Sequence, residues 1–305
     1  MAFSAYYERI KSMKLITFLY NSKELVGVIT PDGQRIVPCS ELGVNYADME
    51  TLAAHITDEE LAAMKQKLEG FPGGISLSEV KILAPVPRPS RDIICLGVNF
   101  LDHALESADV MGGEYSGERK YPIYFAKHVN EAVPNGDFID GHFDIVTELD
   151  YEAEMAFIVR KDAVNVKAEN AGEYVFGYTV MNDVSARCIQ MRHKQWFRGK
   201  SFDGFAPMGP CVVTADEFEF PPKLDISCKV NGELRQKSNT ALYIHNIPYA
   251  LEELSSGMLI KAGTIISMGT PGGVGMGFKP PKYLKSGDVI ECEVQGIGKL
   301  VNTVK

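Results

Sequence analysis

The chain has 305 residues, 45% of them hydrophobic and 23% charged, which is ordinary for a globular protein and enough for one large domain or two smaller ones. Its 40 acidic residues outnumber 31 basic ones, giving a formal net charge of −9 at pH 7. Nucleic acids and anionic membranes reward a basic surface, so neither is expected as the main partner. No stretch is apolar for long enough to predict a membrane span or a secretory signal.

The cysteines lack CxxC pairs and clusters with histidine, which argues against a zinc site or a disulfide framework. The six positions are Cys39, Cys95, Cys188, Cys211, Cys228 and Cys292. Several lie in apolar runs, where a thiol behaves as a small buried hydrophobic group. We therefore expect a reducing, cytoplasmic location.

The first part of the chain, residues 1–85, is predicted to form a small α+β domain. Two strand-like runs, KLITFLY and ELVGVIT, precede a hairpin with Asp32-Gly33 at its tip. A helical pattern follows, with a second helix start near Asp58 and a stop at Gly70. Nothing in this part suggests chemistry.

Prolines 85, 87 and 89 predict an extended connector to a second domain, residues 86–305. That domain is rich in short strands, with one clear helix predicted over VSARCIQMRHKQWF and a shorter one near PYALEELSS. Many strands and few helices favour a β-rich α+β fold over a doubly wound α/β sheet.

A His–Glu pair follows the first strand of this domain, in the segment DHALE. His103 and Glu106 are three residues apart, so on a helical turn they are neighbours, and Glu106 would orient the imidazole. Such a pair is a common general-base unit. The alternative is an ordinary pair on the surface.

Three acidic residues alternate in the segment TELDYEAEMAFIVR: Asp150, Glu152 and Glu154. On a strand they share one face, and the apolar residues between them share the other. No lysine or arginine is interleaved before Arg160. Clustered carboxylates repel each other and lose hydration, so a hard divalent cation (Mg²⁺, Mn²⁺ or Ca²⁺) would fit between them. The alternative is an edge strand with a solvated acidic face.

The predicted long helix begins after Asp183, a good N-cap residue. Asp183, Arg187 and Gln190 are spaced to share one helix face, where the guanidinium would bind a substrate carboxylate and the amide a carbonyl oxygen. Lys200 follows in a loop, where a solvated surface position is the alternative.

Thr270 opens a glycine-rich segment, GTPGGVGMGF, near the C-terminus. The segment has no GxxxxGK[ST] motif and no βαβ context, which disfavours nucleotide binding. A loop whose backbone N–H groups approach a ligand is the more plausible interpretation, and a tight turn is the alternative. Met111 and Phe278 are further candidates for shaping a pocket.

Together these segments resemble, in the same order, the fumarylacetoacetate hydrolase family. They are ICLGVNFLDHALE, PIYFAK, LDYEAEMAFIV, MNDVSARCIQ, RGKSFDGFAPMGP, GTPGGVG and LKSGDVIECEVQGIGKLVN. The resemblance covers about residues 90–305, and the N-terminal unit resembles that of longer bacterial members. It implies a mixed β-sandwich roll core with a small N-terminal α+β domain, and a homodimer.

The resemblance also implies roles for single residues. Metal ligands fall on Glu152, Glu154 and Asp183, with Asp150 as a neighbour, and the metal would be Mg²⁺ or Mn²⁺, with Ca²⁺ as an alternative. Catalytic roles fall on His103, Glu106 and Lys200, with the first two on a lid. Substrate contacts fall on Arg187, Gln190 and Thr270. Phe100 departs from the family pattern, where many relatives carry tyrosine.

The implied substrates are small 2-oxo acids. Because the His103–Glu106 unit of DHALE, which could activate a water molecule, is retained, we expect hydrolysis of a carbon–carbon bond in an acylpyruvate-type 2,4-dioxo acid, through a metal-bound pyruvate enolate. The same site would support isomerisation or tautomerisation of 2-hydroxy-dienedioates, decarboxylation of oxaloacetate, or dehydration of 2-oxo sugar acids. A relative that binds a metabolite without turnover is a further alternative.

Overall fold

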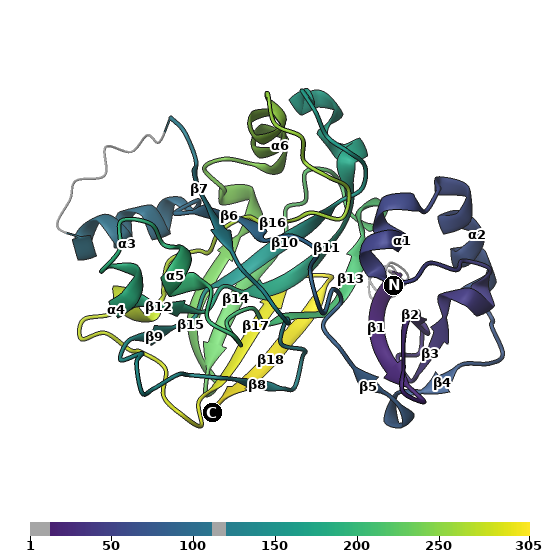
Figure 1. Cartoon of the computed structure of the whole chain (residues 1–305), viewed down its shortest axis with the longest axis horizontal. Coiled ribbons are helices and arrows are strands. Elements are labelled where there is room, and N and C mark those ends of the chain that lie inside the picture. The colour runs from purple at the N-terminus through teal and green to yellow at the C-terminus, as the bar shows by residue number, and fades with distance from the viewer. Residues whose placement is uncertain (1–12, 112–119) are drawn as a thin grey trace, which may run out of the picture.

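The computed structural model describes residues 13–111 and 120–305, apart from the side chains of residues 108–111. Two stacked sheets dominate it, one of 11 strands and one of five (Figure 1). Contacts of β10 and β11 with β14, β17 and β18 place the small sheet against the large one. The fold is therefore β-rich with helices at its periphery, as predicted.

The large sheet contains β1 (Lys14–Tyr20), β2 (Lys23–Ile29), β3 (Arg35–Pro38), β4 (Ile75–Ser76), β5 (Lys81–Ile82), β6 (Ile93–Gly97), β7 (Ile123–Lys127), β10 (Ala153–Val159), β11 (Val175–Asn182), β13 (Met208–Thr214) and β16 (Ile265–Ser267). The five-stranded sheet contains β8 (Phe138–Ile139), β14 (Asp225–Val230), β15 (Glu233–Asn239), β17 (Val289–Val294) and β18 (Gly298–Val304). A third sheet pairs β9 (Leu149–Asp150) with β12 (Ser185–Ala186).

The α-helices are short and surround the sheets: α1 (Met49–His55), α2 (Asp58–Leu68), α3 (Leu101–Met111), α4 (Arg187–Gln190), α5 (Phe197–Lys200) and α6 (Ile247–Ser255). Short 3-10 helices occur at η1 (Cys39–Leu42), η2 (Leu77–Glu79), η3 (Ala168–Tyr174), η4 (Ala215–Glu217), η5 (Thr240–Leu242) and η6 (Gly275–Gly277). In Figure 1, α1 and α2 lie at one end of the molecule, and α3, α4 and α5 gather at the other.

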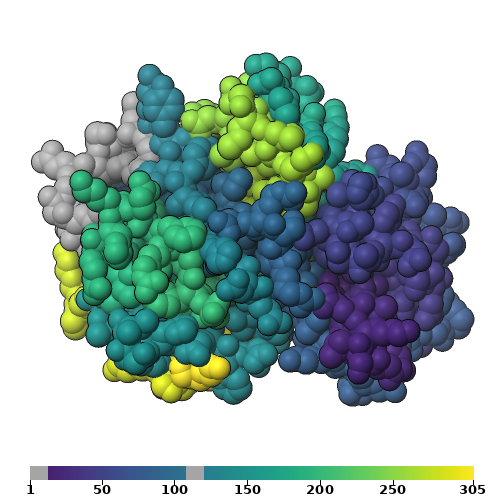
Figure 2. All heavy atoms as spheres, in the orientation of Figure 1, coloured from purple at the N-terminus to yellow at the C-terminus, as the bar shows by residue number. Residues whose placement is uncertain are grey.

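The N-terminal elements form as predicted. The hairpin between β2 and β3 has Gly33 at a φ of +71°, and Thr57 closes a capping box with Glu60 at the start of α2. Strand β1 pairs with β13, so the N-terminal strands extend the same sheet that runs through the main part of the chain. Figure 2 shows the N-terminal part packed directly against the rest. The boundary at residue 85 stays a prediction.

Strand β10 lies between β11 and β16 and organises the core. Tyr151, Met155 and Phe157, from one side of the segment, belong to the larger hydrophobic cluster, which includes strands of the small sheet. Ala156 and Ile158, from the other side, belong to a second cluster with residues of α1 and α2. The period of two expected from the sequence is therefore present.

The long helix predicted over residues 184–197 is wrong. The chain there forms β12 and α4, then an exposed turn, then α5. Ser185 pairs with Asp150, and the side chains of residues 191–195 are exposed, so this segment has no apolar stripe that a continuous helix would bury. Asp183 does not cap the helix, because the N-cap of α4 is Ala186. The shorter helix expected near PYALEELSS is confirmed as α6.

All six cysteines are free thiols, and all except Cys188 are buried. The closest pair is Cys228 and Cys292, whose sulfur atoms lie 3.9 Å apart on paired strands. Within residues 13–111 and 120–305, no helix has the length and apolar character needed to cross a bilayer.

We predict that Phe157→Ala lowers the free energy of unfolding by about 3–5 kcal/mol, because the ring is 0% exposed between the two sheets. Urea unfolding measures the effect. As a control, Leu234→Ala removes a side chain that is 50% exposed and should change stability by about 0.5 kcal/mol or less. Equal losses in the two variants would contradict the assignment of Phe157 to the core.

Candidate active site

Three carboxylates converge where β10 begins and β11 ends. The antiparallel register places Ala153 opposite Asn182, which brings Asp183 beside Glu152 and Glu154. One oxygen from each of the three carboxylates lies within 4.8 Å of the others, and all three residues are buried. An all-oxygen donor set of this size suits a hard divalent cation. The predicted metal ligands are therefore brought together.

Lys200 and Arg187, expected to act in catalysis and in substrate binding, form ion pairs with the carboxylates of this cluster. Lys200 Nζ donates to Glu152 Oε2 and to Asp183 Oδ2, each at 2.6 Å. Arg187 donates from Nη2 to Glu152 Oε1 at 2.6 Å and from Nε to Asp150 Oδ2 at 2.8 Å. Asp150 thus lies beside the cluster and holds Arg187, in agreement with its expected role as a neighbour.

Lys127 is a site residue that the sequence analysis missed. It is fully buried at the end of β7, and its Nζ donates to Asp183 Oδ1 at 2.7 Å, to the carbonyl of Val184 at 3.0 Å and to the carbonyl of Lys200 at 2.5 Å. Burial lowers the pKa of Lys127. The available signal was a lysine that ends the apolar run PIYFAK, since such a residue is buried only when it is paired.

The four carboxylates and three cations of this cluster leave one net negative charge when all are ionised. The imbalance is concentrated on Glu154, which makes no ion pair within the described part of the chain. Among the described residues, its Oε2 accepts hydrogen bonds from two neutral donors, Ser267 Oγ at 2.5 Å and Gly269 N at 3.1 Å.

The pKa values of the two glutamates move in opposite directions. Burial, reinforced by the charges of Asp183 and Glu152, raises the pKa of Glu154 well above its usual range. Burial would also raise the pKa of Glu152, but the charges of Lys200 and Arg187 outweigh it and hold that pKa below its usual range. A bound cation would therefore stabilise the ionised form of Glu154 more than that of Glu152.

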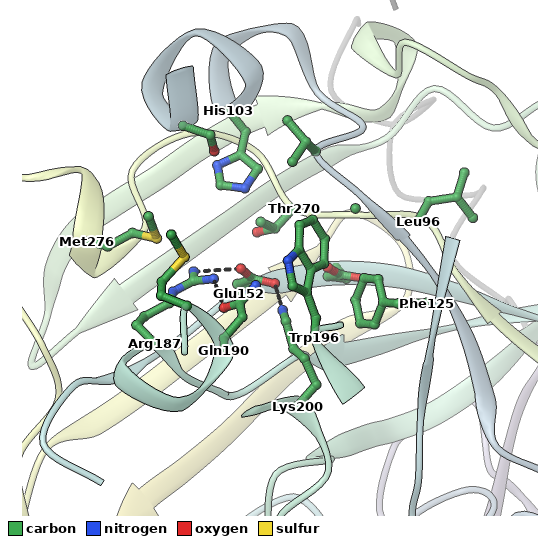
Figure 3. Close-up of a pocket in the computed structure, with 15 residues that line it drawn as sticks. Leu96, His103, Phe125, Glu152, Arg187, Gln190, Trp196, Lys200, Thr270 and Met276 are labelled. Carbon is green, nitrogen blue, oxygen red and sulfur yellow. Dashed lines mark hydrogen bonds and ion pairs between the residues drawn. The ribbon is translucent and has the colours of Figure 1, made fainter. Parts of the chain in front are cut away.

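The predicted general-base unit, His103 with Glu106, is formed on α3. His103 Nδ1 lies 3.2 Å from Glu106 Oε2, and His103 is 5% exposed. Figure 3 shows His103 projecting from α3 across the pocket from Glu152 and Arg187. Because Nδ1 faces Glu106, Nε2 is the ring nitrogen left for a ligand.

The three predicted substrate contacts all line the same pocket. Arg187 Nη1 donates to Gln190 Oε1 at 3.0 Å, which leaves the amide NH₂ of Gln190 for a ligand. The hydroxyl of Thr270 donates to the carbonyl of Ala153 at 2.9 Å and accepts from Gln236 Nε2 at 2.8 Å. Thr270 thus has a structural role here, and its contact with substrate stays a prediction.

The pocket has a charged floor and an apolar wall. Apolar lining residues are Leu96, Val98, Phe125, Met191, Trp196 and Met276. The pocket is narrow and partly open: the centre of a water molecule can occupy about 20 Å³ of it, which is room for about one water molecule. Phe100 packs against Tyr243 with ring centroids 4.6 Å apart and lies outside this lining. Phe278 packs against Lys282 instead of lining the pocket, and the side chain of Met111 lies outside the described residues.

The glycine-rich segment after β16 directs its backbone amides at carboxylates of the protein itself. Gly273 N donates to Glu106 Oε1 at 3.0 Å, and Gly275 N and Met276 N donate to the two oxygens of Asp150 at 2.6 and 3.1 Å. With the hydrogen bond from Gly269 N to Glu154, the amides of this segment bind three carboxylates of the site: Glu154, Asp150 and Glu106. The approach of these amides to a ligand stays a prediction.

The chain belongs to the fumarylacetoacetate (FAA) hydrolase family, because residues 92–305 match the family model described as fumarylacetoacetate (FAA) hydrolase C-terminal. It is 38% identical to oxaloacetate tautomerase YisK of Bacillus subtilis, over 96% of this chain and 100% of that protein.

Two solved structures share this fold over 96% of the chain. The fumarylacetoacetate hydrolase from psychrophilic Exiguobacterium antarcticum matches with a TM-score of 0.79 and 37% identity, covering 96% of this chain and 99% of that one. A maleylpyruvate hydrolase from Sphingobium sp. SYK-6 matches with a TM-score of 0.73 and 28% identity, covering 96% and 99%. The resemblance and the fold class inferred from the sequence are thus confirmed.

We predict opposite effects of Glu154→Gln and Glu152→Gln on the metal-free protein. A carboxyl whose pKa is raised by folding destabilises the folded protein as the pH rises above the pKa of the unfolded state. Glu154→Gln removes this effect, so it should raise the melting temperature in EDTA at pH 7–8. A carboxyl whose pKa is lowered by folding stabilises the fold above its unfolded pKa, so Glu152→Gln should lower the melting temperature there.

Added Mn²⁺ should raise the melting temperature of the parent protein, because a ligand that binds only the folded state stabilises it. Both variants should lose most of this gain. A Glu154→Gln protein that is less stable than its parent in EDTA, or that keeps the full Mn²⁺ response, would contradict the role given to Glu154.

Proposed function

We propose that this protein is a divalent-metal-dependent tautomerase that interconverts the keto and enol forms of a small 2-oxo dicarboxylic acid of the oxaloacetate type. The observation that carries the proposal is the buried cluster of Glu152, Glu154 and Asp183, because both glutamates line the same pocket as His103, the partner of Glu106. The similarity to a protein named oxaloacetate tautomerase, over its full length, supports this reaction above the others.

Glu152, Glu154 and Asp183 would hold the metal ion, and Mg²⁺ or Mn²⁺ fits their oxygen donors, with Ca²⁺ as an alternative. When bound, such an ion supplies Lewis-acid polarisation of the substrate's 2-oxo group. The single net negative charge of the cluster would become a single positive charge with a dication, which favours an anionic substrate.

The residues around the ion provide the proton transfer. His103 Nε2 takes a proton from C3, and Glu106 stabilises the imidazolium that forms. The C3–H bond electrons form the C2=C3 double bond, and the carbonyl oxygen gains the negative charge. Returning the proton to this oxygen gives the enol, and the reverse sequence gives the keto acid. The reaction consumes no water and no oxidant.

Two donors are available for the oxygen that becomes charged. Lys200 uses two of its three N–H donors on Glu152 and Asp183, so one remains. Burial lowers the pKa of Lys200, but Asp183 and Glu152 outweigh burial and raise it, so Lys200 stays charged. The amide NH₂ of Gln190 is the second donor. Such donors favour the charge that develops in the transition state.

Hydrolysis of an acylpyruvate-type 2,4-dioxo acid is the second candidate. His103 and Glu106 would activate a water as readily as they remove a proton from carbon, and the maleylpyruvate hydrolase of matching fold supports this outcome. Hydrolysis needs a water between His103 and the distal carbonyl carbon, in addition to the substrate. We also propose a cytoplasmic homodimer, from the cysteine content and the family resemblance.

We predict that the purified protein with Mn²⁺ accelerates the loss of enol-oxaloacetate absorbance, and that EDTA abolishes this activity. His103→Ala should lower kcat by about 10²–10⁴-fold, as expected for loss of a general base, and leave Mn²⁺ binding unchanged. His128→Ala is the matched control, because His128 is an exposed histidine paired with Asp92 outside the pocket.

The same preparations should be offered acetylpyruvate and maleylpyruvate, with pyruvate release as the readout. Hydrolysis would be favoured if pyruvate is released from acetylpyruvate or maleylpyruvate faster than enol-oxaloacetate is consumed. Full tautomerase activity in EDTA, or equal activity of the His103→Ala and His128→Ala variants, would contradict the proposal.

A further inference from the structure

The glycine-rich segment packs against α3, and there Gly277 lies against the carboxylate of Glu106. A Cβ atom added at Gly277 would lie 1.9 Å from Glu106 Oε1, 2.2 Å from its Cδ and 2.6 Å from its Cγ. The backbone of Gly277 is outside the left-handed region, so its conformation does not require glycine. The side chain of Glu106 is what occupies the space that any other residue would need.

We propose that Gly277 is a positioning residue for the base: its missing side chain gives Glu106 the room to orient His103. This inference rests on the proposed function, in which His103 moves the proton. Glu106 is held by His103 Nδ1 at 3.2 Å on one oxygen and by Gly273 N at 3.0 Å on the other. Both contacts need the carboxylate where it is.

An alanine at position 277 would displace the end of Glu106 by more than an ångström, because carbon–oxygen contacts below about 3 Å are not tolerated. A shift of that size breaks a hydrogen bond that is already 3.2 Å long. His103 then loses the partner that sets its ring orientation and stabilises its charged form. The fold is spared, because the clash involves only the end of a flexible side chain.

The other glycines of the segment differ in this respect. A Cβ at Gly273 would lie 1.9 Å from the backbone carbonyl oxygen of Arg235, and Gly273 has a φ of +97°. At Gly275 a Cβ would lie 2.7 Å from the carbonyl oxygen of Lys282. Substitutions there distort the backbone itself. At Gly272 the nearest atoms belong to Asp102, at 3.4 Å, so alanine fits. Gly272 therefore provides a matched control.

The test is a double-mutant cycle of Gly277→Ala and Glu106→Ala, with Gly272→Ala as control, assayed for enol-oxaloacetate tautomerisation with Mn²⁺. Gly277→Ala should lower kcat by about 10–100-fold and leave KM, Mn²⁺ affinity and the melting temperature close to those of the parent. In the Glu106→Ala background the same substitution should cost less than about twofold, because no carboxylate remains to be displaced. Gly272→Ala should behave as the parent.

Crystal structures of Gly277→Ala and Gly272→Ala give a readout that does not depend on the substrate. The contact between His103 Nδ1 and Glu106 should be lost in the first and kept in the second. Equal losses of kcat in both backgrounds, or an intact contact in the Gly277→Ala structure, would overturn the inference. If the parent protein turns over neither enol-oxaloacetate nor acylpyruvates, the proposed function fails, and the two crystal structures alone decide the role of Gly277.

Discussion

The structure of this site depends on the burial of four carboxylates against three cationic side chains. Each charge taken out of water must be compensated, and Lys127, Lys200 and Arg187 do this for Asp183, Glu152 and Asp150. Within residues 13–111 and 120–305, Glu154 has neutral hydrogen-bond donors and no ion pair. The surrounding sheets hold the cluster together, and the proposed chemistry rests on a cation that would compensate this remaining carboxylate.

The glycine-rich segment connects the parts of this site that lie on different elements. Its amides donate to Glu154 in the carboxylate cluster, to Asp150, which pairs with Arg187, and to Glu106, which pairs with His103. A side chain would meet Asp150 at Gly275, Glu106 at Gly277 and the backbone of Arg235 at Gly273, which explains these three glycines without any nucleotide. One short segment thus sets the position of the base relative to the proposed metal ligands.

Much of this could be predicted from local patterns. The alternation of Glu152 and Glu154 and the three-residue spacing of His103 and Glu106 depend only on the periods of strand and helix. Arg187 and Gln190 do meet, and Asp183 joins the same charged cluster, but through the β9–β12 pairing and one helical turn, so the helix used to group them is wrong. The pairing of Lys127 with Asp183, and the carboxylates that accept from the glycine-rich segment, join residues far apart in the sequence. Local periodicity therefore could not predict them.

The most direct test is anomalous diffraction from crystals of the full chain grown with Mn²⁺. The account predicts one manganese peak, with carboxylate oxygens of Glu152, Glu154 and Asp183 at about 2.0–2.2 Å, as expected for a hard divalent ion bound by oxygen. A manganese ion bound elsewhere, or these three carboxylates turned away from one another while the fold is intact, would contradict the central claim.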